Sequence, residues 1–266
     1  MGLEALERVS QQIKMNLVDL SQRNHETSQK LSEKEQRKSL YKCDKCQDSG
    51  WILIRQEPSQ PLAIACECRK IEKLKNEWKS CGINTEMCKH TFSNFEAWNA
   101  AAERAKDTGI AYYQDFDGIR GGRRNSILFC GQVGSGKTHL SVALAINFLK
   151  KKIKVVYMPY RDVITKIKQN MLDAEYYCKL ISNYQICEVL LIDDLFKGKI
   201  NDSDINIIFE IINYRYLNFL PIIVSTEFNI DRLLSFDEGV GSRIYEMSKD
   251  YVVEIEKDMK NNYRLK

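Results

Sequence analysis

Residues 126–138 read SILFCGQVGSGKT, and this stretch decides the fold. Its apolar part, 127–130, predicts a buried strand, and residues 131–138 match the phosphate-binding motif G-x-x-x-x-G-K-[ST] at every fixed position. Glycines in such a loop allow backbone N–H groups to turn inward around phosphate oxygens. The apolar pattern after Lys137 predicts a helix, whose positive N-terminal end strengthens the anion site. We therefore expect a strand, a phosphate-binding loop and a helix in direct succession.

Each part of this loop has an expected role. Its backbone wraps the phosphates of ATP, Lys137 reaches the outer phosphates, and the hydroxyl of Thr138 ligates Mg²⁺. The loop residues expected to bind the nucleotide are Gly131, Gln132, Val133, Gly134, Ser135, Gly136, Lys137 and Thr138.

After the loop, strand-like and helix-like patterns alternate along the chain. This alternation predicts a parallel sheet covered by helices on both faces. Together with the strand at 127–130 it gives an α/β P-loop NTPase fold with a five-stranded parallel sheet. The expected further strands are 153–158, 189–192, 221–226 and 251–255, and the expected helices are 96–117, 161–172, 176–181, 205–219 and 233–247.

The run 189–194, VLLIDD, is an apolar strand that ends in two carboxylates. Ligands in sheets of this kind bind at the carboxyl ends of the strands. Asp193 is therefore expected to hold Mg²⁺, directly or through water, and Asp194 to orient or polarise the attacking water. Many nucleotide-hydrolysing relatives have Glu at the second position. Because Asp is one methylene shorter, we expect slow hydrolysis.

The N-terminal part of the chain contains two pairs of cysteines. Cys43 and Cys46 form a C-x2-C pair, and Cys66 and Cys68 form a C-x-C pair after a segment with the pattern of a hairpin. A hairpin would bring the four thiols together as a tetrahedral zinc site. The alternative is a set of buried, inert cysteines, but the charged residues around these positions are poor core neighbours.

Composition sets broad limits on the function. The net charge of +4 permits contact with nucleic acid without requiring it. The nine cysteines cannot all pair within one chain, and no signal peptide or membrane-spanning stretch is present, so we expect a cytoplasmic protein. The absence of N-K-x-D and L-S-G-G-Q motifs argues against a GTPase and a transporter ATPase.

Four stretches resemble one family. These are GQVGSGKTHLSVALA at 131–145, VLLIDDL at 189–195, PIIVSTE at 221–227 and GSRI at 241–244. These stretches follow an N-terminal cysteine module. In this combination they are similar to the bacterial and phage DnaC/DnaI-type helicase loaders, which are AAA+ ATPases. IstB-type transposition helper ATPases share the GKTHL and IDDL parts of these stretches, and the cysteine module favours the DnaI-like loaders.

This resemblance implies roles for further residues. The polar group that ends the strand 221–226 corresponds to a position that inspects the γ-phosphate. A carboxylate cannot donate to phosphate, which leaves two alternatives: Thr226 senses the phosphate, or Glu227 positions water. Arg243 matches an arginine finger that acts on ATP in a neighbouring subunit, and Arg264 resembles a second late arginine at the nucleotide.

The resemblance also implies partners and a domain arrangement. Residues 1–90, with an amphipathic helix expected over 1–20, would contact a DnaB-like replicative helicase, and 91–266 would form the AAA+ ATPase that assembles into a homo-oligomer. Arg161, Lys166 and Lys168, with Tyr160, would contact single-stranded DNA, unless they form only a solvated helix face. Competing hypotheses are an IstB-like transposition helper and a P-loop small-molecule kinase, although no arginine-rich lid is apparent.

Overall fold

The structure is a computed structural model. Its contacts divide the chain into two compact units, Met1–Glu72 and Lys73–Lys266. The helix expected over 1–20 lies outside the described part of the chain, and the domain division at residue 90 remains a prediction. The residues that the structure describes are 43, 45–54, 62–66, 68–69, 82–83 and 86–266.

The first unit contains an antiparallel hairpin of strands β1 (Trp51–Ile54) and β2 (Leu62–Ala65). Trp51 pairs with Ala65, so the start of β1 and the end of β2 lie side by side. The carbonyl of Gly50 accepts a hydrogen bond of 2.9 Å from the N–H of Cys66. The predicted hairpin is thus confirmed, and it joins the segments that carry the two cysteine pairs.

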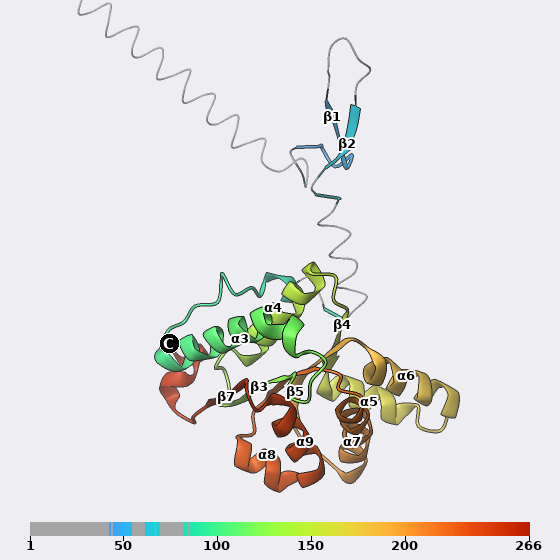
Figure 1. The fold of residues 1–266 in the computed structure, drawn as a ribbon, viewed down its shortest axis with the longest axis vertical. Coiled ribbons are helices and arrows are strands. Elements are labelled where there is room, and N and C mark those ends of the chain that lie inside the picture. The colour runs from blue at the N-terminus through green and yellow to red at the C-terminus, as the bar shows by residue number, and fades with distance from the viewer. Residues whose placement is uncertain (1–42, 44, 55–61, 67, 70–81, 84–85) are drawn as a thin grey trace, which may run out of the picture. The chain divides into compact units, whose positions relative to one another are not determined.

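The second unit is built on a five-stranded sheet with the order β4-β5-β6-β3-β7, and every neighbouring pair is parallel (Figure 1). This confirms the predicted α/β fold. The chain leaves β3 toward one edge of the sheet and leaves β6 toward the other, although β3 and β6 are neighbours. Such a reversal opens a crevice at the carboxyl ends of the strands. The strands are β3 (Ile127–Gly131), β4 (Val155–Pro159), β5 (Val189–Leu195), β6 (Ile222–Thr226) and β7 (Val252–Ile255).

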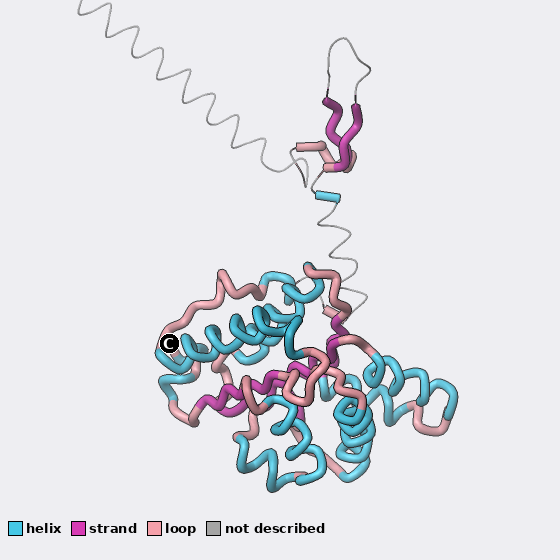
Figure 2. The backbone as a smooth tube through the Cα atoms, viewed as in Figure 1, coloured by secondary structure: helices cyan, strands magenta, loops and turns pink. Residues whose placement is uncertain are grey.

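Helices cover both faces of this sheet, so the strands form one central layer (Figure 2). Alternate residues of each strand point to opposite faces. Ile127 and Phe129 pack with α3 and α4, whereas Leu128 and Cys130 pack with the helices of the other face. The helices are α3 (Ala100–Ile119), α4 (Lys137–Lys150), α5 (Tyr160–Gln169), α6 (Ala174–Ile186), α7 (Asp202–Leu217), α8 (Ile230–Phe236) and α9 (Glu238–Ser248).

All the helices predicted within 96–247 differ from the observed ones in their bounds, and in two cases a capping residue explains the difference. The helix expected to begin at residue 96 begins at Ala100, because the side chain of Asn99 accepts from the N–H of Ala102 and caps it. The single helix expected over 233–247 is two helices, since Asp237 is extended and its side chain caps α9. No helix among the described residues is long and apolar enough to cross a membrane.

Candidate active site

The loop between β3 and α4 has a backbone that favours glycine at three positions. Gly131, Gly134 and Gly136 have φ values of 100°, 72° and 84°, in a region that side chains disfavour. A Cβ atom at Gly131 would lie 2.1 Å from the carbonyl oxygen of Ile255, and one at Gly136 would lie 2.6 Å from the ring of Phe95. The loop is therefore packed closely by β7 and by the segment before α3, and α4 begins directly after it. The predicted succession of strand, loop and helix is confirmed.

The ammonium of Lys137 lies inside the curve of this loop. It donates to the carbonyl oxygens of Gly131 at 2.9 Å and Gln132 at 2.5 Å. The hydroxyl of Ser135 donates to the same Gln132 carbonyl at 2.7 Å. Burial lowers the pKa of Lys137, and the nearby carboxylates oppose this effect. The loop thus holds a buried cation at the N-terminus of α4, and both the charge and the helix end favour a phosphate group.

Asp193, at the end of β5, is the centre of a hydrogen-bond network. Its Oδ1 accepts from the hydroxyls of Thr138 at 2.9 Å and Ser225 at 2.5 Å, and its Oδ2 accepts from Tyr157 at 3.0 Å. Burial raises the pKa of Asp193, and these hydrogen bonds oppose the rise. A carboxylate beside a threonine hydroxyl is a set of hard oxygen donors that fits Mg²⁺. Sequence reasoning paired Thr138 with Asp193 but gave Ser225 and Tyr157 no role.

Asp194, Lys197 and Glu227 form a charged group beside this network. The Lys197 ammonium is 2.7 Å from Asp194 Oδ2 and 3.1 Å from Glu227 Oε1. Asp194 has a left-handed φ of 55°, and its N–H donates to the hydroxyl of Ser225 at 2.8 Å. The end of β5 is therefore fixed to β6, and it directs the Asp194 carboxylate into the cleft.

Thr226 and Glu227, the two alternatives for the γ-phosphate position, lie in different environments. Thr226 is fully buried, and its hydroxyl donates to the carbonyl of Leu195 at 2.8 Å and accepts from the N–H of Phe228 at 3.2 Å. It does not line the cleft, whereas Glu227 does. The expectation that Thr226 senses phosphate is therefore corrected, because its hydroxyl joins strand ends inside the fold.

One cleft of about 450 Å³ is lined by Lys137, Thr138, Asp194, Lys197 and Glu227. Asp193 is not among the lining residues, but it is hydrogen-bonded to Thr138, which is. The walls of the cleft come from distant parts of the sequence: the segment before α3 contributes Phe95 and Trp98, and the turns at 259–265 contribute Tyr263 and Arg264. The rings of Trp98 and Tyr263 lie 5.0 Å apart between centroids. The loop residue Val133 also lines the cleft. The cleft therefore joins a charged end to flat aromatic side chains, which suits a nucleotide.

The turns at 259–265 are bonded directly to the phosphate-binding loop. The N–H of Tyr263 donates to the carbonyl of Gly134 at 2.9 Å, and its hydroxyl donates to Glu96 at 2.7 Å. The indole N–H of Trp98 donates to the carbonyl of Lys260 at 3.1 Å. The predicted site residue Arg264 is thus placed at the cleft by this segment. The aromatic wall was missed, because no motif links positions so far apart in the sequence.

Comparison with known proteins agrees with this site. The sequence model described as "IstB-like ATP binding protein" matches residues 91–233, more than half of the chain. The Bacillus subtilis protein YqaM is 40% identical over 209 residues, which cover 75% of this chain and 66% of YqaM. The phage-like element PBSX protein XkdC of the same species is 35% identical over 225 residues, which cover 81% and 82%.

The chain belongs to the IstB-like ATP binding protein family.

Solved structures place this IstB-like protein among AAA+ ATPases. The crystal structure of the DnaC helicase loader matches with a TM-score of 0.56 and 27% identity, covering 64% of this chain and 99% of that one. The replication initiator DnaA bound to AMPPCP and single-stranded DNA matches with a TM-score of 0.54 and 25% identity, covering 65% and 51%. The chain is therefore an AAA+ ATPase, and the strand-loop-helix unit at β3 and α4 is the P-loop of that fold.

Arg243 of the IstB-like chain lies on α9 and is not among the residues that line the cleft. Its Nε donates to Asn213 at 3.1 Å and its Nη1 donates to the carbonyl of Gly239 at 2.7 Å. The guanidinium also lies over the ring of Phe209, 5.0 Å from its centroid. These contacts hold Arg243 between α7 and α9. An arginine finger acts on a neighbouring subunit, so this role remains a proposal.

The helix α5 presents only part of the surface expected to contact DNA. Tyr160 is 1% exposed and its ring packs against Phe196, so its expected stacking on a base is corrected. Arg161 and Lys166 are exposed, whereas Lys168 is bonded to Asp204 at 2.8 Å. The basic face therefore consists mainly of two exposed positions at the start and middle of α5.

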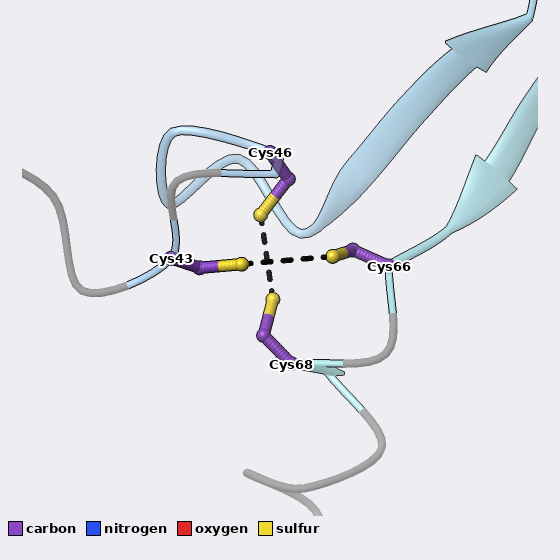
Figure 3. Close-up of side chains that lie close together, drawn as sticks. All are labelled: Cys43, Cys46, Cys66 and Cys68. Carbon is purple, nitrogen blue, oxygen red and sulfur yellow. Dashed lines mark hydrogen bonds between the residues drawn. The ribbon is translucent and has the colours of Figure 1, made fainter. Parts of the chain in front are cut away.

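In the first unit, the four cysteine thiols of the family member converge on one point (Figure 3). Their sulfur atoms all lie within 4.8 Å of one another. Cys43 and Cys66 are separated by 3.7 Å and Cys46 and Cys68 by 3.3 Å between Sγ atoms. Four thiolates on a tetrahedral metal at ~2.3 Å would be separated by ~3.8 Å. The predicted set of four thiols is thus brought together, and its donors fit a thiophilic metal.

Proposed function

We propose that this protein is an ATP-dependent loader of a replicative DNA helicase in the cytoplasm. The observation that carries the proposal is the ATP cleft, set in a fold that matches the DnaC helicase loader over almost the whole of that chain. The similarity to a phage-element protein over four-fifths of both chains supports a role in replication of a mobile element.

ATP with Mg²⁺ acts in this proposal mainly as a switch. Lys137 and the loop hold the phosphates, Thr138 and Asp193 hold Mg²⁺, and Asp194 and Glu227 face the attacking water. Bound Mg²⁺ would supply positive charge that offsets the charge of the phosphates. The short side chain of Asp194 supports slow hydrolysis, so that the ATP-bound form persists long enough to control a partner.

Both parts of the chain contribute to partner binding in this proposal. Residues 1–90 contact the helicase, with zinc held by Cys43, Cys46, Cys66 and Cys68. Residues 91–266 form the ATPase, which assembles through subunit contacts that place Arg243 at the neighbour's ATP. The exposed Arg161 and Lys166 on α5 would contact single-stranded DNA, as supported by DnaA, a structural neighbour bound to such DNA.

A transposition helper is the second candidate, and the family description favours it. The "IstB-like" sequence model covers the ATPase core, which both candidate functions share. The cysteine cluster in the first unit favours the helicase-loader function, since it adds a separate module that can bind a partner protein.

Co-purification with the replicative helicase from the same cell, with ATP and without it, tests the proposal. A stable complex whose release depends on nucleotide would support the loader function. The variant Lys137→Ala should bind no ATP and should not respond to it, whereas Lys150→Ala, at the other end of α4, should behave as wild type. Failure to bind the helicase, together with ATP-dependent coating of duplex DNA, would favour the transposition helper.

A further inference from the structure

Lys197 is a cleft residue that no motif identifies, and it connects the two carboxylates expected to face the attacking water. Its ammonium is 2.7 Å from Asp194 and 3.1 Å from Glu227. All three side chains line the ATP cleft. The hydrogen bond to Asp194 raises the pKa of Lys197, so the ammonium remains charged at neutral pH.

The backbone at the end of β5 and in the turn after it positions Asp194 and Lys197 for this contact. Asp194 and Phe196 have left-handed φ values of 55° and 62°, and the N–H of Lys197 donates to the carbonyl of Asp194 at 3.1 Å. The side chain of Phe196 is 2% exposed and packs against the rings of Phe228 and Phe236. A left-handed φ at a residue other than glycine costs free energy unless the surrounding packing holds it in place. Here the buried ring of Phe196 holds the turn in the conformation that directs Lys197 into the cleft.

The two carboxylates of Asp194 and Glu227, which line the cleft near each other, explain why a cation is needed between them. Glu227 occupies the position from which family members inspect the γ-phosphate, but a carboxylate can only accept hydrogen bonds. Asp194 and Glu227 would together repel a triphosphate. An ammonium between them compensates one of these charges and supplies the donor that Glu227 lacks.

We propose that Lys197 is the specificity-determining residue through which this cleft distinguishes a nucleoside triphosphate from a diphosphate. The inference rests on the proposed ATP binding. Lys197 offers a donor to the terminal phosphate while it remains tied to a carboxylate. Its contribution is therefore absent for ADP, which has no group at this end of the cleft, and Lys137 and the loop bind both nucleotides.

Equilibrium binding of Mg·AMPPCP and Mg·ADP to the full chain tests this inference without any hydrolysis. For Lys197→Met we expect about a tenfold loss of affinity for AMPPCP, the loss of one charge-assisted hydrogen bond, and ADP affinity within about twofold of wild type. Lys197→Arg should restore most of the preference. Lys249→Met, which removes an exposed lysine from the end of α9, should change neither affinity.

A double variant separates charge from structural damage. Glu227→Gln combined with Lys197→Met leaves one uncompensated carboxylate, as in the wild type, and the introduced side-chain amide can donate to phosphate. We expect this double variant to recover part of the preference for AMPPCP. Equal affinities of Lys197→Met and wild type for AMPPCP, or equal losses for both nucleotides, would overturn the inference. Failure of the wild type to bind either nucleotide would instead overturn the proposed ATP site.

Discussion

Thr138 and Asp193 lie 55 positions apart in the sequence, yet the Thr138 hydroxyl donates to Asp193 at 2.9 Å. One residue belongs to the first turn of α4 and the other to the end of β5. Their contact joins the two motifs at the crevice where β6 separates β3 from β5. The contact places two oxygen donors from two elements side by side, a set that suits Mg²⁺.

The first prediction concerns this pair. Asp193→Asn keeps the shape and an accepting oxygen but removes the charge that attracts Mg²⁺. We expect the strengthening of ATP binding by Mg²⁺ to fall by at least about tenfold, with ATP binding in EDTA little changed. Titration of ATP with and without Mg²⁺ measures this. Asp231→Asn on α8 is the matched control, and an unchanged Mg²⁺ effect in Asp193→Asn would contradict the assignment.

The second prediction concerns Arg243. If it acts on the ATP of a neighbouring subunit, Arg243→Ala should bind ATP within about twofold of wild type and lose hydrolysis by about a hundredfold or more. Arg104→Ala, an exposed position on α3, should retain activity. Measurements of ATP affinity and turnover on the same preparations separate the two effects.

A mixing experiment tests whether Arg243 acts between subunits. Lys137→Ala subunits cannot hold ATP but keep Arg243, and Arg243→Ala subunits hold ATP but lack the arginine. If the arginine acts in trans, mixing the two inactive variants should restore part of the hydrolysis. No recovery, in mixtures that do assemble, would restrict Arg243 to its contacts with Asn213 and Gly239.

The third prediction concerns the cysteine cluster. We expect the full chain to bind about one zinc ion, because four thiolates complete a tetrahedral site. Cys46→Ser should release zinc and loosen the hairpin of β1 and β2, since metal binding and local folding are coupled. Metal content by mass spectrometry, with Cys178→Ser as the control at an exposed cysteine, measures this. Full zinc content in Cys46→Ser would exclude the four-thiol site.

The sequence was most informative where function and local structure use the same residues. The glycines of 131–136 are needed both for phosphate binding and for their left-handed backbone, so one motif predicted the strand, the loop and the helix. The alternation after it predicted the parallel sheet. Asp193 was recognisable because an apolar strand ends at it, and strand ends meet at one edge of a parallel sheet.

The missed features depend on contacts between distant segments. Tyr157 and Ser225 bond to Asp193 from neighbouring strands, and nothing local distinguishes them from other polar residues at strand ends. Trp98 and Tyr263 meet only because the turns at 259–265 fold back on the loop. Thr226, in contrast, was predicted as a site residue from its position at the end of a strand. Its hydroxyl donates to the carbonyl of Leu195 and does not line the cleft.

Arg215 on α7 provides the last prediction, which concerns stability. This guanidinium is fully buried, and it donates to the carbonyls of Cys187 at 2.8 Å, Pro221 at 2.7 Å and Tyr184 at 3.0 Å. It therefore joins the end of α6 to the starts of β5 and β6. No carboxylate is among the hydrogen-bond partners described for it, so backbone oxygens compensate its charge.

Replacing Arg215 with Met keeps much of the apolar volume but leaves these carbonyls without donors. Because hydrogen bonds from charged groups stabilise by more than neutral ones, we expect the free energy of unfolding to fall by about 3–5 kcal/mol. Urea denaturation followed by circular dichroism measures this. Arg120→Met, at a largely exposed ion pair with Glu188, should cost less than about 1 kcal/mol. Similar stabilities of the two variants would show that the buried guanidinium is dispensable to the packing of α6 and α7 against the sheet.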